Sequence, residues 1–215
     1  MNDDNRGSMV SVSAIVFTAL SIFTMLLRGY VRAYMLRSFG FDDWVMLLTV
    51  VLFVIYSVFA LLGVQAGIGR PISSLTLEAA STALKNWWFC TLFYSLSSTA
   101  LKVAIGSFLL RVTKVEVQVY ILWAAMALSV AFGTSFFFFY LFRCSPFAAF
   151  WDTTGAVGGT CIPTVYLTNM TYAHAAILCV VDCTFAIIPS FIVRGLQINR
   201  RSKAVVCFIL TLGAA

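Results

Sequence analysis

Long apolar runs dominate the chain, and short polar segments separate them. A hydrocarbon core of roughly 30 Å needs about 20 apolar residues in a helix, so each full run is long enough to cross a bilayer. The pattern therefore predicts an all-α fold, a polytopic transmembrane helix bundle with five full spans and a partial sixth, forming a single domain over residues 1–215. The runs lie at roughly 9–27, 44–66, 87–110, 117–142, 164–193 and 204–215.

The first and last runs need separate interpretation. The first follows Asp3 and Asp4 and leads into arginines without a small-residue cleavage site, so it predicts a retained helix and not a signal peptide. The last run stops at Ala215 after about half a span. Because a half-span leaves backbone groups that lipid cannot satisfy, we expect a chain cut short relative to a longer parent, with a short re-entrant helix as the alternative.

Composition excludes several classes of protein. Hydrophobic residues make up 61% of the chain and charged residues only 10%, whereas about a quarter of a soluble domain is charged. The formal charge of +6 does not indicate a nucleic-acid partner, because no soluble face gathers the basic residues. No Cys/His cluster has zinc-ligand spacing, so we expect neither a metal site nor a cofactor.

Basic residues are divided unevenly between the two sides of the membrane. Nine follow the first, third and fifth runs, and four lie on the opposite side. The richer side is predicted to be cytoplasmic, which makes the amino terminus extracytoplasmic in a plasma membrane or endomembrane protein. The nine are Arg28, Arg32, Arg37, Arg111, Lys114, Arg194, Arg200, Arg201 and Lys203, and the four are Arg6, Arg70, Lys85 and Arg143.

The connection from 143 to 163 lies on the oxidising side in this topology. It contains Cys144 and Cys161, which we predict to form a disulfide; the alternative pairs Cys90 with one of them, as in many seven-helix receptors. Asn169, followed by Met170 and Thr171, fits the N-glycosylation pattern but lies close to the membrane, so it is a weaker candidate.

Two opposite charges lie at membrane depth. Lys102 and Asp182 each interrupt an otherwise uncharged run. A charge at the bilayer centre costs from roughly 3 kcal/mol on insertion scales to more than about 10 in simulations, so each should face the bundle interior and have a partner. Counting residues from the cytoplasmic arginines places Asp182 roughly 4 to 5 Å nearer the outside, and a direct pair is geometrically reasonable.

Small and polar residues follow each charge at helical spacing, as is typical of contacts between helices in lipid. We therefore expect the two stripes to face each other or one shared cavity. The third-run stripe is Thr91, Ser95, Ser98, Lys102 and Gly106, and the fifth-run stripe is Thr168, Tyr172, Ala175, Cys179, Asp182, Ala186 and Pro189.

The pair has two interpretations. It fixes helix register, or it lines a ligand pocket with Lys102, Asp182, Ser98, Cys179 and His174 as candidate ligand-binding residues. His174 is either half of a catalytic dyad with Asp182 or a local hydrogen-bonding residue. Asp42 and Asp43 are predicted to cap the second helix, with a site for a cytoplasmic partner as the alternative.

Several motifs in this order resemble the fungal rhodopsin-domain integral membrane family, which includes the satratoxin-cluster membrane protein and fungal GPCR-like surface-sensing proteins. The resemblance spans nearly the whole chain. It rests on Gly40-Phe41-Asp42-Asp43-Trp44, Gly67-Ile68-Gly69, Leu101-Lys102, Phe108-Leu109-Leu110-Arg111-Val112, Phe142-Arg143-Cys144-Ser145-Pro146, Phe150-Trp151-Asp152, Gly159-Thr160-Cys161, Asp182, Ile188-Pro189 and Arg200-Arg201.

The resemblance implies a truncated seven-helix, receptor-like layout and an association with secondary-metabolite gene clusters. It does not imply retinal, because Lys102 lies in the third run and the retinal lysine belongs to the last helix. We expect a sensor or accessory protein whose partners are the lipid bilayer, a small lipophilic ligand and a cytoplasmic signalling partner. The alternatives are an embedded cyclase-type or isomerase-type enzyme acting on a lipophilic metabolite, and a scaffold or inactive truncated receptor-like protein.

Overall fold

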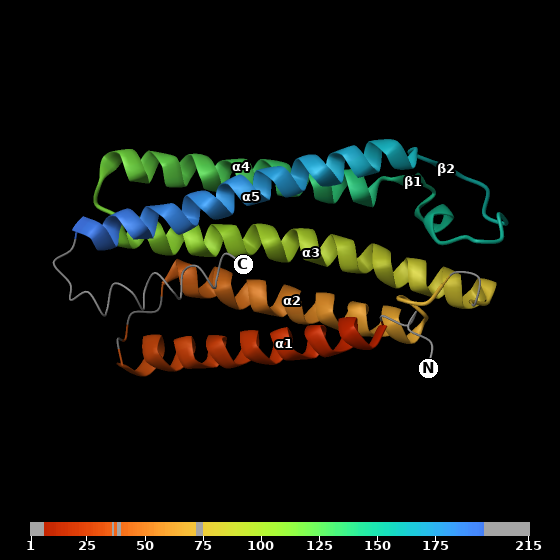
Figure 1. Cartoon of the computed structure of the whole chain (residues 1–215), viewed down its shortest axis with the longest axis horizontal. Helices are drawn as coiled ribbons and strands as arrows, with labels where there is room; N and C mark the ends of the chain where they lie inside the picture. Colours follow the sequence, from red (N-terminus) through yellow and green to blue (C-terminus); the bar gives the residue numbers. More distant parts are fainter. Residues whose placement is uncertain (1–6, 36, 38–39, 72–74, 196–215) are drawn as a thin grey trace.

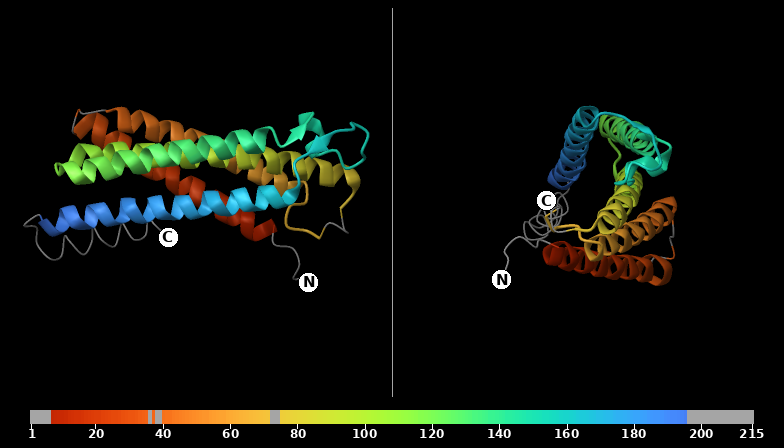
Figure 2. Two further views of the ribbon diagram at one scale, coloured as in Figure 1. Left: turned by 90° about the horizontal axis from the view of Figure 1, so that it is seen from above. Right: turned by 90° about the vertical axis from the view of Figure 1, so that its right-hand side faces the viewer.

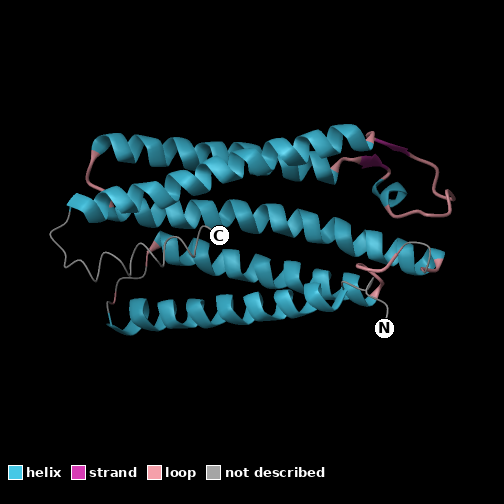
Figure 3. Ribbon diagram, in the orientation of Figure 1, coloured by secondary structure: helices cyan, strands magenta, loops and turns pink. Residues whose placement is uncertain are grey.

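The computed structural model describes residues 7–35, 37, 40–71 and 75–195, and the predicted partial span at 204–215 lies outside them. Five long helices make up most of this part of the chain (Figures 1 and 3). All five are long and apolar enough to cross a membrane, which confirms the predicted all-α bundle. They are α1 (Gly7–Tyr30), continued by a π-helical segment (Val31–Met35), α2 (Phe41–Gln65), α3 (Leu77–Val112), α4 (Glu116–Leu141) and α5 (Thr164–Gly195).

The helices pack in chain order, with α3 in the middle of the bundle. α1 packs on α2, α2 and α4 both pack on α3, and α5 packs chiefly on α4 (Figure 2). Side chains such as Phe23 and Leu26 on α1 are exposed, as expected for surfaces that face lipid. The face of α5 that is buried is apolar, and it meets α4 through Val181, Phe185 and Ile188.

Helix α3 is longer than the membrane is thick. Its 36 residues extend about 54 Å, against roughly 30 Å of hydrocarbon, so part of it lies outside the hydrocarbon. Figure 1 shows its first residues extending past the ends of α1 and α2. It begins at Leu77, ten residues before the apolar run at 87, because a helix outside the hydrocarbon can carry charges such as Glu78 and Lys85. Thr76 accepts a hydrogen bond from the amide of Ala79 at 3.3 Å and caps this extension.

The connection between α4 and α5 forms a small folded cap at that same end, which we call the disulfide end. Its two short antiparallel strands, β1 (Cys144–Ser145) and β2 (Thr160–Cys161), are joined by the Cys144–Cys161 disulfide, as predicted. A 3-10 turn (Phe147–Phe150) lies between them. Cys90 is a free, buried thiol on α3, so the alternative pairing is absent from the described structure.

The cap is ordered by its own hydrogen bonds and rests on α3. Asp152 accepts from the Thr154 hydroxyl at 2.6 Å and from the Val157 amide at 2.7 Å. These bonds, the Thr154 hydroxyl first, lower the pKa of Asp152 below its ordinary value. Thr153 donates to the Leu77 carbonyl at 3.2 Å, which joins the cap to the projecting end of α3.

Three arginines and two aspartates join α1, α2 and α3 at the opposite end, which we call the arginine end. Arg28 donates to both Asp42 and Asp43 at 2.8 Å, and Arg32 and Arg111 approach Asp42 at 3.5 and 3.7 Å. Asp43 also accepts from the Gly40 amide at 3.0 Å, so the predicted capping role is present. Both carboxylates are buried, and their pairing with arginines on neighbouring helices goes beyond capping.

Replacing Asp43 by Ala tests how much this cluster stabilises the bundle. The change removes the acceptor of Arg28 and of the Gly40 amide, so we expect a loss of about 3 kcal/mol in the free energy of unfolding. Denaturant unfolding in lipid nanodiscs measures it. The control is Glu116→Ala, an exposed acid in the first turn of α4 at the same end, with an expected loss below about 1 kcal/mol. Equal losses would contradict the role given to the cluster.

Breaking the disulfide tests the stability of the cap. Its cysteines are 17 residues apart, and releasing a loop of that length should cost about 3 kcal/mol. We expect Cys144→Ser to lower the midpoint of thermal unfolding and to make it insensitive to added reductant. Cys183→Ser, which replaces an exposed free thiol on α5, should leave the midpoint unchanged.

Candidate functional site

Lys102 of α3 and Asp182 of α5 form a direct ion pair between Nζ and Oδ1 within the membrane-spanning part of the bundle. The two side chains differ in exposure: that of Lys102 is 8% exposed and that of Asp182 is 40% exposed. Each charge depends on the other, because hydrocarbon solvates neither of them. The two residues predicted to pair are in contact.

Packing between α3 and α4 places the lysine. The hydroxyl of Ser95 donates to the Gly133 carbonyl of α4 at 3.0 Å, and the bond is buried. A Cβ atom added at Gly106 would collide with Met126 of α4, so glycine is needed for the close approach. Ser95 and Gly106 of the predicted α3 stripe thus contact α4, and Lys102 forms the ion pair with α5.

The predicted stripe on α5 is placed differently from expectation. Tyr172 is 72% exposed and Cys179 is also exposed, so in the described structure neither packs against α3. The reason is that α5 buries its apolar face on α4, which turns the small and polar face outward. Ser98, one turn from Lys102 on α3, is half-buried. The ligand-binding role assigned to these residues from sequence stays a prediction.

His174 lies on the buried face of α5. It is only 4% exposed, and its ring stacks on Phe136 of α4 with centroids 4.4 Å apart and planes 15° apart. Its Nε2 has no hydrogen-bond partner among the described residues. The stacking on Phe136 therefore helps to fix the ring, and the roles predicted for His174 stay predictions. Asn169 is exposed in the second turn of α5, and its glycosylation stays a prediction.

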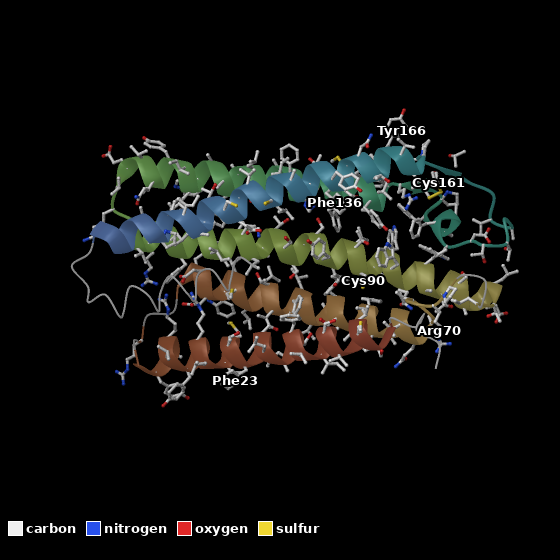
Figure 4. The ribbon with its side chains drawn as sticks, viewed as in Figure 1. Phe23, Arg70, Cys90, Phe136, Cys161 and Tyr166 are labelled. Atoms are coloured by element: carbon white, nitrogen blue, oxygen red, sulfur yellow. A yellow bond between two sulfur atoms is a disulfide. The ribbon has the colours of Figure 1, made fainter. Side chains whose placement is uncertain are left out.

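One cavity of about 360 Å³, which we call the main cavity because all five described long helices line it, lies nearer the disulfide end than the ion pair does. Figure 4 shows Cys90 and Phe136 in the half of the bundle nearer Cys161. The lining residues are mostly apolar or aromatic, with hydroxyl groups interspersed: Tyr56 and Ala60 of α2, Thr91 and Tyr94 of α3, Tyr140 of α4 and Thr171 of α5.

The lining of this cavity has the composition of a binding site for a small, largely apolar molecule. Sites of this kind hold a few placed polar groups in an apolar wall. The hydroxyls of Tyr56 and Tyr94 have no hydrogen-bond partner within the described part of the chain, and the two rings lie 6.1 Å apart.

Lys102, Asp182 and His174 are not part of the cavity wall. Tyr94 precedes Lys102 by eight residues, so the ion pair lies about 12 Å along α3 from the nearest lining residue of that helix. Sequence reasoning missed the cavity because it followed charges. The sequence feature that could have predicted the cavity is that several apolar runs carry tyrosines and threonines at a similar depth in the membrane.

The chain belongs to the fungal rhodopsin domain family, which matches residues 27–215. One curated relative is 25% identical over 212 residues, the wortmanamides biosynthesis cluster protein C of Talaromyces wortmannii. The match covers 94% of this chain and 56% of the relative, so the chain spans little more than half of that protein's length. No solved structure matches the chain significantly. The predicted family is confirmed, and the protein is a multi-pass membrane protein.

Three variants test the ion pair. Asp182→Ala strands the buried ammonium of Lys102, so we expect a loss on the order of 3 kcal/mol in the free energy of unfolding. Lys102→Met should cost about as much, because it strands the carboxylate of Asp182 within the membrane-spanning part of the bundle. The double variant, Lys102→Met with Asp182→Leu, should be closer to wild type than Asp182→Ala is. Denaturant unfolding in nanodiscs gives all three values, and a double variant at least as unstable as Asp182→Ala would contradict the ion-pair argument.

Proposed function

We propose that this member of the fungal rhodopsin domain family is a sensor or accessory protein of secondary metabolism that binds a small apolar molecule in its main cavity. The observation that carries the proposal is the cavity wall, which combines aromatic and aliphatic side chains with phenol hydroxyls that have no partner among the described residues. A ligand with an apolar body and one or two oxygen functions fits this chemistry, because the hydroxyls of Tyr56 and Tyr94 could each take one hydrogen bond.

The name of the relative supports the metabolic setting. That protein is called a biosynthesis cluster protein, and 94% of the present chain aligns with it. The products of such clusters are often apolar enough to partition into a membrane. We therefore assign the ligand to the metabolites of a fungal biosynthetic cluster.

Orientation in the membrane favours ligand access from the outer side. A disulfide persists in oxidising compartments, and cytoplasmic connections are rich in arginine. The disulfide end would then face out of the cytoplasm and the arginine end would face into it. The cavity lies toward the outer end, whereas a cytoplasmic partner would meet the inner end.

A physical path connects the cavity to the ion pair. Phe136 lines the cavity and stacks on His174, which precedes Asp182 by eight residues on the same helix. A ligand that displaces Phe136 would therefore shift α5, and the Lys102–Asp182 contact would favour one of two helix positions. Only a ligand that binds one arrangement more tightly than the other can shift this balance.

Catalysis is the weaker alternative. A general acid or base must lie within hydrogen-bond reach of the reacting atom. Asp182 and His174 are outside the cavity wall, and the lining residues that the structure describes contribute hydroxyls and one thiol but no carboxylate or imidazole. The residues that surround a bound molecule are therefore suited to recognition.

A gene replacement in the native host tests the proposal. The host gene is deleted and complemented by wild type, by Ala60→Trp or by Ala175→Trp. Ala60 lines the cavity, so the indole should fill it, whereas Ala175 is exposed on α5 and serves as the matched control. We expect deletion and Ala60→Trp to lower all cluster products together with their transcripts at least about tenfold, and Ala175→Trp to restore them.

Two results would overturn the proposal. Accumulation of one discrete intermediate in the deletion strain would indicate a catalytic or transport step. Unchanged products and transcripts would indicate a scaffold or an inactive protein.

A further inference from the structure

The Gly67-Ile68-Gly69 motif ends α2 and fixes the position of one side chain. The amide of Ile68 donates to the Gly63 carbonyl at 2.9 Å and that of Gly67 to the Val64 carbonyl at 3.0 Å, the pattern of a Schellman motif. Gly67 has φ +117° and Gly69 has φ +92°, and residues with a side chain rarely adopt either value. The turn therefore directs Ile68 back onto α2.

Two glycines of this turn leave room for neighbouring side chains to pack. A Cβ atom at Gly63 would collide with Cδ1 of Ile68, so the glycine provides the space in which the isoleucine packs. A Cβ atom at Gly67 would meet Leu75 in the same way. Both glycines are buried. The glycines of this segment therefore allow the turn after α2 and the close packing of Ile68 and Leu75.

A second cavity of about 340 Å³ lies beside this turn, which we call the vestibule. Its wall includes Arg70, Leu84 and Trp87, together with Thr153 of the cap. Trp87 precedes Arg111 by 24 residues, or about 36 Å along α3, which places it at the membrane surface of the disulfide end. Its side chain is 52% exposed, as suits an aromatic residue at the interface.

The vestibule and the main cavity share two residues, Ile68 and Trp87. We propose that the vestibule is the access site for the ligand, and that Ile68 and Trp87 form the gate that selects which molecules pass into the main cavity. The inference rests on the proposed function, because it assumes a ligand in the main cavity. The ligand would be a narrow molecule with an apolar body, because the two side chains of the gate are the hydrocarbon of Ile68 and the indole of Trp87. Arg70, exposed at the vestibule, suits a polar end group on that molecule.

Cys90 provides a reporter on the far side of the gate. It lines the main cavity, is buried and carries a free thiol. In a background with Cys179, Cys183 and Cys207 replaced by Ala, Cys90 is the one cysteine left outside the disulfide. The rate at which N-ethylmaleimide modifies it in nanodiscs, followed by intact mass spectrometry, measures passage into the cavity without any knowledge of the natural ligand.

We expect Ile68→Ala and Trp87→Ala to accelerate modification about tenfold and Ile68→Phe to slow it about as much. Leu84→Ala changes the vestibule alone, and Leu167→Ala changes the main cavity alone, so both should stay within about twofold of the parent. Retention of the disulfide and an unchanged unfolding midpoint show that each variant has folded.

The proposed gate is contradicted if Cys90 is modified no faster in the Ile68→Ala variant than in the Leu84→Ala variant. It is also contradicted if Cys90 in the Ile68→Phe variant is modified as fast as in the parent. Equal acceleration by Leu167→Ala would also overturn it, because the reagent would then arrive through the lipid-facing side of α5. These results do not depend on the host experiment. A working gate with no change in metabolites would leave the access route standing and remove the sensor.

Discussion

Hydrocarbon cannot solvate a polar group, and the arrangement of these helices follows from that constraint. Each polar side chain within the bundle needs a partner, and several find one on a neighbouring helix. Thr18 bonds Ser57 at 2.7 Å between α1 and α2, and Ser95 bonds the Gly133 carbonyl at 3.0 Å between α3 and α4. The Lys102–Asp182 pair is the extreme case, because it links α3 to α5 through two charges.

The same constraint divides the bundle into levels along its axis. Charges that must stay near water gather at the arginine end, where Arg28 and Arg111 share Asp42. The ion pair lies deeper, and beyond it the packing loosens into a cavity whose polar groups are hydroxyls. A wall of hydroxyls can remain empty at lower cost than a wall of charges, so this is the level at which a bundle in lipid can keep space for an apolar molecule.

Helix α5 shows how apolar packing and polar pairing compete. Its apolar face, with Val181 and Phe185, is buried in a core cluster made chiefly with α4, and burial of apolar surface is the favourable term that sets its rotation. Asp182 lies at the edge between the two faces, and its carboxylate can still reach Lys102. The exposed remainder, including Tyr172, is a polar and small surface of α5 that the described residues leave uncovered.

The sequence by itself determined the helices, and it predicted the partner of Lys102 and the disulfide, with a pairing through Cys90 left as the alternative. Run length fixes the number of spans in the described part of the chain, and the cost of a lone charge in hydrocarbon leaves Lys102 and Asp182 only each other. Only the tertiary structure decided which face of α5 is buried, and that Tyr56, Cys90 and Phe136 surround one cavity. The reason is that helical periodicity places a residue on a face of its own helix, whereas the rotation of each helix depends on the volumes of the side chains that its neighbours present.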